Sequence, residues 1–280
     1  MADITLIADS GSTKTDWLLL DNETGKQRTF KTQGINPFML SEEQIKEIIQ
    51  RELLNEKDFV PPTAIRFYGA GCRGRQCDML RSVLAQLFPL ATGHIVVDSD
   101  LVGAAKALCG DADGIACILG TGSNSCLYQN GKIVSNVSPL GYILGDEGSG
   151  AVLGRRLIGD VLKHQLPLHL CQDFEEQYHL SSDDIITRVY KQPFANRFLA
   201  SFVPFLHRHK EEQVIRDLLT EEFSRFFQRN IRQYNRPDLP VSFVGSVAYY
   251  FREELKVAAL QCGFTIGRVL KNPLEGMAGA

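Results

Sequence analysis

The stretch IADSGSTKTDWLLLD, residues 7–21, decides how the chain begins to fold. Two apolar runs enclose the block SGSTKT, and Asp9 stands just before it. Apolar runs joined by glycine and hydroxyl residues predict two strands linked by a tight turn. Glycine lets a backbone approach a phosphate closely, and hydroxyl and free N–H groups can bond its oxygens. The turn is therefore predicted to contact phosphate.

Asp9 ends the first predicted strand, where a carboxylate is costly to bury unless it has a cation or a hydrogen-bond donor. A bound Mg²⁺, held directly or through water, would meet that need. We therefore predict Asp9 as the metal-contacting residue.

A second stretch repeats this pattern in the other half of the chain. GIACILGTGSNSCLYQNGKIV, residues 114–134, runs strand, turn, strand, turn and strand, as does ITLIADSGSTKTDWLLLDNETGKQRTF, residues 4–30. Two such pieces, each opening one half of the chain, indicate a structural duplication, with a boundary in CGDADG, residues 109–114. The turn GTGS, residues 120–123, would then be a second phosphate contact facing the first. Either turn alone could instead be a plain hairpin turn.

Composition narrows the class of protein. The chain has 280 residues, 44% of them hydrophobic, and a formal net charge of -3, so no basic surplus points to nucleic acid. No apolar run approaches the roughly 18 residues that span a bilayer, and no basic leader precedes Asp3. The seven cysteines include no CxxC pair, which favours reduced thiols. We expect a cytoplasmic protein with a small-molecule substrate and no membrane or nucleic-acid partner.

The remaining elements follow from periodicity and turn residues. Strands are expected at 4–8, 16–20, 28–32, 65–68, 94–97, 241–244 and 265–270 as well as in 114–134. Helices are expected at 41–54, 76–87, 101–108, 147–163, 211–234 and 248–261, with a short one after Pro273.

A rival nucleotide signature must be weighed. GAGCRG, residues 69–74, is a formal GxGxxG between a strand and a helix, and Asp98 ends the next strand. That is the setting of a dinucleotide fingerprint, so an NAD-dependent dehydrogenase is an alternative. The motif would leave the turns at 10–15 and 120–123 unexplained. No GxxxxGK[ST] occurs, which excludes a P-loop enzyme.

Seven short motifs follow one another along the chain: DSGSTKTDW, GINPF, YGAGCRG, VVDSDLVGA, ILGTGSNS, LGDEGSG and FVGSVA. Their order resembles the ATPase superfamily shared by sugar kinases, heat-shock chaperones and actin. More narrowly, the chain is similar to the BadF/BadG/BcrA/BcrD group, which includes N-acetylglucosamine kinases.

The resemblance implies an α/β fold of two duplicated ribonuclease H-like, actin-like domains of βββαβαβα type, with ATP and substrate in a cleft between them. The domains would span residues 1–112 and 113–270, the second with a helical insertion, and 271–280 would form a terminal helix packing back on the first.

The same resemblance implies the ATP contacts. The terminal phosphates would meet the first turn, with the second turn on the opposite wall and a third loop on the adenosine side. The residues are Gly11, Ser12, Thr13 and Lys14, then Thr121 and Gly122, and finally Gly245 and Ser246. Gly245 could instead be a simple strand-to-helix turn.

The sugar contacts implied by the resemblance are Asn36 of GINPF, Asn124 of GTGSN and Asp146 of GDEGS. Asn36 could instead initiate an Asn-Pro turn, and Asp146 could cap the following helix. Pro37 intervenes before Phe38, which displaces the aromatic residue of the family pattern.

Phosphoryl transfer to a hydroxyl needs a group that accepts its proton, and VVDSD, residues 96–100, offers two carboxylates. The family's aspartate opens a helix and is followed three residues later by glycine, which Asp100 and Gly103 match and Asp98 does not. We predict Asp100 as the catalytic base, contacting the substrate, with Asp98 supporting it. Asp100 could alternatively be only a helix cap.

The expected activity is therefore transfer of the γ-phosphate of ATP, with Mg²⁺, to a hydroxyl of N-acetylglucosamine, most simply the 6-hydroxyl. Alternatives are a glucosamine or N-acetylmuramic acid kinase, an ATPase activator of a 2-hydroxyacyl-CoA dehydratase, the dehydrogenase named above, and a sugar sensor without turnover. A homodimer is compatible with the sequence.

Overall fold

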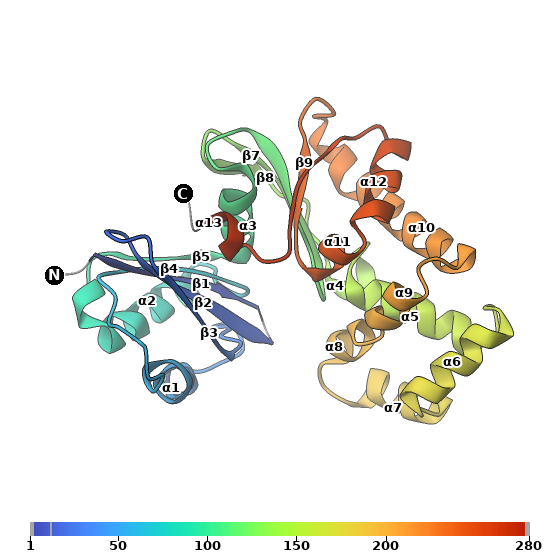
Figure 1. The fold of residues 1–280 in the computed structure, drawn as a ribbon, viewed down its shortest axis with the longest axis horizontal. Coiled ribbons are helices and arrows are strands. Elements are labelled where there is room, and N and C mark those ends of the chain that lie inside the picture. The colour runs from blue at the N-terminus through green and yellow to red at the C-terminus, as the bar shows by residue number, and fades with distance from the viewer. Residues whose placement is uncertain (1–2, 12, 278–280) are drawn as a thin grey trace. The chain divides into compact units, whose positions relative to one another are not determined.

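The computed structural model describes residues 3–11 and 13–277 (Figure 1). The chain divides into two compact units, residues 1–110 with 273–280 and residues 111–272. Each unit is built on its own five-stranded sheet.

The first unit contains a mixed sheet in the order β3-β2-β1-β4-β5. The first three strands are antiparallel neighbours, and the last two run parallel to β1. The strands are β1 (Ile4–Ser10), β2 (Lys14–Asp21), β3 (Gln27–Gln33), β4 (Ala64–Gly69) and β5 (Ile95–Ser99). The helices are α1 (Glu42–Ile49), α2 (Arg75–Leu87), α3 (Asp100–Cys109) and α13 (Leu274–Met277), with a π-helical turn at Gln50–Leu54 and a 3₁₀ turn at Pro89–Ala91.

Helices cover both faces of this sheet, which is why β1 is buried along almost its whole length. Figure 1 shows α1 and α2 on one face and α3 with α13 on the other. Ser41 caps α1 in a reciprocal capping box with Gln44. The expected helix at 41–54 continues past Ile49 as a π-helical turn.

The second unit repeats the arrangement with the order β8-β7-β6-β9-β10, read from the other edge. Its first three strands are antiparallel, and β9 and β10 are parallel. The strands are β6 (Gly114–Leu119), β7 (Ser123–Gln129), β8 (Lys132–Ser135), β9 (Val241–Val244) and β10 (Ile266–Leu270). The predicted α/β fold with two duplicated ribonuclease H-like domains is confirmed.

Most helices of the chain belong to the second unit. They are α4 (Gly141–Leu144), α5 (Gly150–Leu162), α6 (Leu168–Tyr178), α7 (Ser182–Lys191), α8 (Ala195–Ala200), α9 (Val203–Arg208), α10 (Gln213–Arg229), α11 (Ser246–Tyr250) and α12 (Arg252–Gln261), with a 3₁₀ turn at Ile231–Tyr234.

Three expected helices of this unit differ from the structure. The helix predicted at 211–234 ends at Arg229, and a separate 3₁₀ turn follows at Ile231–Tyr234. The single helix predicted at 248–261 is two helices, separated at the fully buried Phe251. The helix predicted from residue 147 begins at Gly150, because Ser149 accepts a hydrogen bond from the Val152 N–H and caps it.

No helix in the described part of the chain is both long and apolar enough to cross a membrane.

Helix α5 packs closely against α8 at Gly154. This contact predicts how the stability of the protein responds when a side chain is added there. A Cβ at Gly154 would lie 1.9 Å from the Leu199 carbonyl oxygen, so Gly154→Ala must push the helices apart. We expect a loss of about 1–3 kcal/mol in the free energy of unfolding, measured by urea denaturation. Gly159→Ala on the same helix meets nothing within 4 Å and should be neutral or stabilising by up to about 1 kcal/mol. Equal effects of the two changes would contradict this reading of α5.

Candidate functional site

The β1–β2 turn is closed by its own backbone. The Gly11 N–H donates to the Lys14 carbonyl at 3.0 Å, and the Gly34 N–H donates to the Thr13 carbonyl at 3.2 Å. The Thr13 and Lys14 side chains are exposed, so a ligand can reach them. Ser12, predicted to bind phosphate, lies outside the described residues.

Carboxylates gather beside this turn. Asp9 and Asp16 are direct cross-strand partners, and the Lys14 ammonium lies 2.5 Å from an Asp16 oxygen. Burial raises the pKa of Asp9 to about 7, assisted by the charges of Asp100 and Asp16, while Lys14 opposes the shift. Asp9 thus stands among more negative than positive charge, which suits a cation.

The Ser10 hydroxyl connects this turn to the loop that carries Asn36. It lies 2.7 Å from the Thr15 hydroxyl, donates to the Ile35 carbonyl at 2.9 Å and accepts from the Ile35 N–H at 3.0 Å. Because Ser10 and Ile35 are fully buried, these bonds fix residue 36 relative to the β1–β2 turn.

Asn36 is buried, and its side-chain oxygen accepts from the Phe38 N–H at 3.0 Å. The turn-initiating role considered from the sequence is therefore present. A Cβ at Gly71 would lie 2.0 Å from the Asn36 Oδ1, so that glycine is needed for the amide to fit.

This contact explains the GxGxxG at residues 69–74 without a dinucleotide. The space in front of Gly71, where φ is +79°, is taken by the Asn36 side chain, and α2 begins only at Arg75. A dinucleotide fingerprint instead uses its glycines to admit a pyrophosphate. The dehydrogenase alternative loses its structural basis.

Asp100 is the first residue of α3 and is half-buried. Ser99 caps this helix by accepting from the Val102 N–H, so the alternative that Asp100 is its N-cap is wrong. Burial raises the pKa of Asp100, against the opposing effects of the Leu101 N–H, which donates to its carboxylate at 2.9 Å, and of the Arg73 charge.

Close packing of α3 on the sheet requires a glycine at position 103, three residues after Asp100. A Cβ there would come within 2.7 Å of the Tyr68 side chain on β4, so α3 can lie close to the sheet only with glycine. The glycine thereby helps set where the first turn of α3, and with it Asp100, lies.

Asp98 faces a different environment. Its carboxylate accepts from the Ser99 N–H at 2.8 Å, and its charge contributes to raising the pKa of Cys72 and Cys77, mainly raised by burial. The two carboxylates belong to different elements, because β5 ends at Ser99 and Asp100 is already part of α3.

The β6–β7 turn of the second unit is bonded to the start of α5. The Gly150 N–H donates to the Gly120 carbonyl at 2.8 Å, and the Ala151 N–H donates to the Thr121 carbonyl at 3.0 Å. The Thr121 side chain remains exposed.

Asp146 lies directly against this turn. A Cβ at Gly122 would be 3.2 Å from the Asp146 Oδ2, and the Ser123 N–H donates to the carboxylate. Burial raises the pKa of Asp146 to about 6, with a smaller contribution from the Glu147 charge. The helix-cap alternative for Asp146 is wrong, since Ser149 caps α5.

Asn124, one residue along β7, is held by its side-chain oxygen. That oxygen accepts from the Ser125 N–H at 2.9 Å and from the Asn136 amide at 3.0 Å. Asn124 therefore has a fixed orientation near the turn that holds Asp146.

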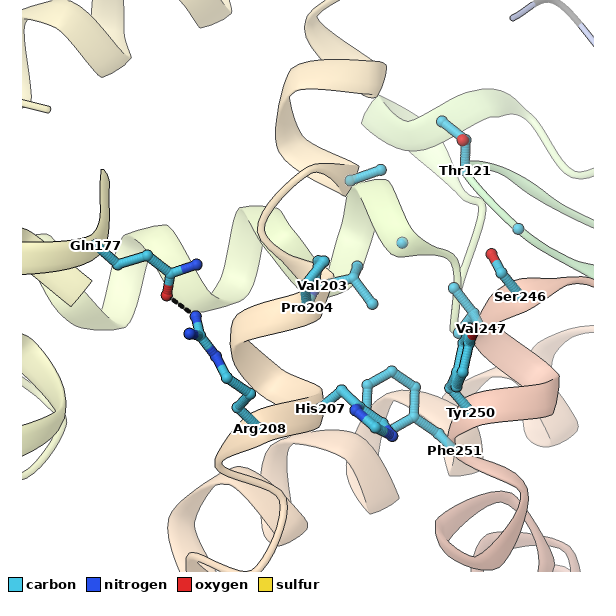
Figure 2. A pocket seen from close by; sticks show the side chains of 13 residues that line it. Thr121, Gln177, Val203, Pro204, His207, Arg208, Ser246, Val247, Tyr250 and Phe251 are labelled. Atoms are coloured by element: carbon cyan, nitrogen blue, oxygen red, sulfur yellow. Dashed lines mark hydrogen bonds between the residues drawn. The ribbon is translucent and has the colours of Figure 1, made fainter. Parts of the chain in front are cut away.

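A cavity of about 690 Å³ opens beside the same turn (Figure 2). Thr121 and Ser246 both line it, so the structure brings together two residues predicted to contact ATP. Gly245 has a φ of +123°, and a Cβ there would lie 2.3 Å from the Leu119 carbonyl oxygen, so only glycine lets this loop approach the end of β6.

Other walls of the cavity were not predicted. Figure 2 shows His207, Tyr250 and Phe251 together at one end and Arg208 bonded to Gln177 at another. The His207 ring lies edge-on to the rings of Tyr250 and Phe251, with centroids 5.3 and 5.8 Å apart. Local sequence contains no signal for these residues, because they come from separate segments: α6, α9, the end of α11 and the residue that follows it.

Comparison of the chain with solved structures identifies its family. A proposed N-acetylglucosamine kinase from Porphyromonas gingivalis is 49% identical, with 98% of this chain and 97% of that chain covered and a TM-score of 0.94. This chain belongs to the BadF/BadG-like N-acetylglucosamine kinase family.

More distant structures share the fold of this family member. A proposed N-acetylglucosamine kinase from Chromobacterium violaceum is 17% identical over 99% of this chain and 98% of that chain, with a TM-score of 0.73. A ROK family glucokinase from Streptomyces griseus, solved with glucose and AMPPNP, is 17% identical over 99% and 96%, with a TM-score of 0.59. No protein-family model matches the chain, and no curated protein matches it.

Proposed function

We propose that this protein is an ATP-dependent kinase that transfers the γ-phosphate to a hydroxyl of N-acetylglucosamine, with the 6-hydroxyl as the acceptor. The proposal is carried by the 49% identity to the Porphyromonas gingivalis protein, over nearly the whole of both chains. It is supported by Asp100, a half-buried carboxylate at the start of α3 with a raised pKa.

Asp100 acts as the base in this proposal. It accepts the proton of the sugar hydroxyl while that oxygen bonds to the γ-phosphorus, and the bond from phosphorus to the departing ADP oxygen breaks. A raised pKa improves a carboxylate as a proton acceptor near neutral pH. The Leu101 N–H holds the carboxylate in one orientation, so that it can aim the hydroxyl.

The two turns bind the phosphates. Backbone groups of Gly11 and Gly122 permit close approach, and the exposed Thr13, Lys14 and Thr121 side chains supply hydrogen bonds and charge. Lys14 is paired with Asp16 in the free protein, so we expect it to exchange that partner for phosphate oxygens.

Asp9 fits a magnesium site. Its carboxylate stands among the charges of Asp16 and Asp100, and magnesium commonly takes one or two protein carboxylates with water and substrate phosphates completing its shell. Within the described residues there is no group of three or more His, Cys, Asp or Glu side chains that could hold a metal ion, so water and phosphate oxygens would have to complete the shell. When bound, Mg²⁺ would neutralise charge on the phosphates.

The sugar is held by Asn36, Asn124 and Asp146 in this proposal. The ionised Asp146 can accept a hydrogen bond from a sugar hydroxyl, and the two amides can bond further hydroxyl or acetamido groups. Both amides are fixed by local bonds, which lowers the entropy lost on binding.

The adenosine part of ATP would occupy the 690 Å³ cavity, whose size and largely apolar lining suit a nucleoside. Filling the cavity should block ATP. Val203→Trp on α9 places a large ring in it, so we expect the ATP-dependent rise in melting temperature to disappear while sugar binding persists. Val257→Trp, at an exposed position on α12, is the matched control. An unchanged ATP response of Val203→Trp would place the nucleotide elsewhere.

The activity itself is tested by ADP release over a panel of glucose, glucosamine, N-acetylglucosamine, N-acetylmannosamine and N-acetylmuramic acid, followed by NMR of the product. We expect the highest kcat/KM for N-acetylglucosamine and a phosphorus coupling to its C6 protons. Turnover with another sugar but not with N-acetylglucosamine would show that the proposed substrate is wrong. No turnover with any of the sugars would refute the proposed kinase activity. A brown colour under anaerobic purification would instead indicate an iron–sulfur activator.

A further inference from the structure

The loop that carries Asp146 contains a second carboxylate with a different environment. Glu147 is 6% exposed, and both of its oxygens are bonded. Oε1 accepts from the Arg229 Nε at the end of α10, and Oε2 accepts from the Asn230 amide at 3.2 Å. The loop is thereby fastened to a segment more than eighty positions away in sequence.

Asp146 itself has a strained backbone. Its φ of +53° lies in the left-handed region, which is uncommon for residues with a Cβ, although Asp enters it more readily than most. The Asp146 N–H donates to the Pro139 carbonyl at 2.8 Å, and its carbonyl accepts from the Ser149 N–H at 3.0 Å. These two bonds join Asp146 to residues shortly before and shortly after it in the sequence. Neither bond connects the loop to a distant part of the second unit.

The carboxylate of Asp146 depends on this conformation. It lies against Gly122 and accepts the Ser123 N–H, so its oxygens have a defined place only while the loop keeps its path. The side chain of the next residue, Glu147, bonds the loop to Arg229 at the end of α10 and to Asn230 just after it. Releasing Glu147 would let residue 146 relax toward an ordinary backbone conformation and withdraw its carboxylate from the turn.

We propose that Glu147 is a positioning residue, which holds the Asp146 carboxylate at the β6–β7 turn through a clamp with Arg229 and Asn230. This inference rests on the proposed role of Asp146 in binding the sugar. Glu147 does not contact substrate in it, and it acts by fixing the residue that does. The clamp therefore sets sugar affinity more than ATP affinity or the chemical step.

A second buried glutamate that is paired with arginine, Glu222, provides a matched control for Glu147. Glu222 on α10 is fully buried, and its Oε1 accepts from Arg156 at 3.0 Å and from Arg225 at 2.9 Å. Like Glu147 it links α10 to another part of the second unit through arginine, but it is not adjacent in sequence to a proposed substrate contact. If the substitutions acted only by weakening the fold, changing Glu147 and changing Glu222 should therefore alter the sugar KM equally.

The test compares Glu147→Gln, Glu147→Ala and Glu222→Gln in the full chain. For Glu147→Gln we expect the KM for N-acetylglucosamine to rise about 10-fold, the low end of the effect of changing residues that orient metal ligands. The kcat and the KM for ATP should stay within about 2-fold of wild type. Glu147→Ala should raise the sugar KM further. Glu222→Gln should lower the melting temperature and leave the sugar KM unchanged. Asn230→Ala removes one bond only and provides a milder variant if the others fail to fold, with a smaller rise in the same KM.

Crystal structures of the variants give a readout that does not depend on activity. In Glu147→Ala, or in Asn230→Ala if needed, we expect the Asp146 carboxylate to have left the Ser123 N–H. An Asp146 that stays in place, or a sugar KM that changes no more than in Glu222→Gln, would overturn the inference. A wild-type protein that phosphorylates no sugar would instead refute the proposed function, and the position of Asp146 in the variant crystals would still decide the clamp.

Discussion

Asp100→Asn is expected to lower kcat by about 10²–10⁴-fold, the usual contribution of a general base. The amide has the same shape and its oxygen can still accept from the Leu101 N–H, so α3 should keep its first turn. Sugar binding, measured by calorimetry, should change by less than about 3-fold, because the removed group acts mainly in the transition state.

The control for this change is Asp98→Asn, two residues earlier. Asp98 accepts from the Ser99 N–H, and its charge acts on the thiols of Cys72 and Cys77. We expect it to retain at least about a third of wild-type kcat, since it lies outside the chemistry in this account. An active Asp100→Asn beside an inactive Asp98→Asn would reverse the assignment.

Asp9→Asn is expected to lower kcat/KM for MgATP by about 100-fold or more, equivalent to about 2.7 kcal/mol. The same change should stabilise the free protein at pH 8. Asp9 has a pKa of about 7 in the fold and an ordinary value near 4 when unfolded, so the folded state holds a proton that the unfolded state has released between these values. Asp9 therefore makes the free energy of unfolding of the wild type fall as the pH rises from about 4 to about 7.

Thermal denaturation at pH 6 and pH 8 measures this effect. The difference in melting temperature between Asp9→Asn and wild type should be larger at pH 8, where wild-type Asp9 is ionised. The control is Asp21→Asn, at the partly exposed end of β2. Hydrogen bonds from the Thr24 backbone and side chain lower the pKa of Asp21, so this carboxylate is ionised at both pH values. A variant that loses stability at pH 8, or that keeps its response to Mg²⁺, would contradict the role given to Asp9.

Much of the fold could be predicted from local sequence, because its signals are local. The two hairpins have apolar strands separated by glycine and hydroxyl residues, and Ser41 with Gln44 forms the capping box that starts α1. The repeat of that hairpin pattern in each half predicted a structural duplication, and the two sheets indeed share one strand order.

The differences arise where tertiary contacts decide. Phe251 lies in an apolar stretch that predicts one continuous helix, yet the residue is fully buried at the break between α11 and α12. A helix cap was the alternative to the predicted sugar-contacting role of Asp146, but Ser149 takes the capping role and leaves Asp146 against Gly122.

The site was predicted unevenly for the same reason. Asn36 and Asp100 lie in short motifs that the family resemblance could match, whereas His207 reaches the cavity from α9 with no pattern around it. The bond between Glu147 and Arg229 joins residues far apart in sequence, so no periodicity or spacing could reveal it.

The central claim is that the turns at residues 10–15 and 120–123 bind the same triphosphate. The most direct measurement is a crystal structure of the protein with a non-hydrolysable ATP analogue, Mg²⁺ and N-acetylglucosamine. The account predicts phosphate oxygens bonded to Thr13 or Lys14 and to Thr121 or Gly122, with a sugar hydroxyl on Asp100. A triphosphate bound at residues 69–74, or contacted by only one of the two turns, would contradict it.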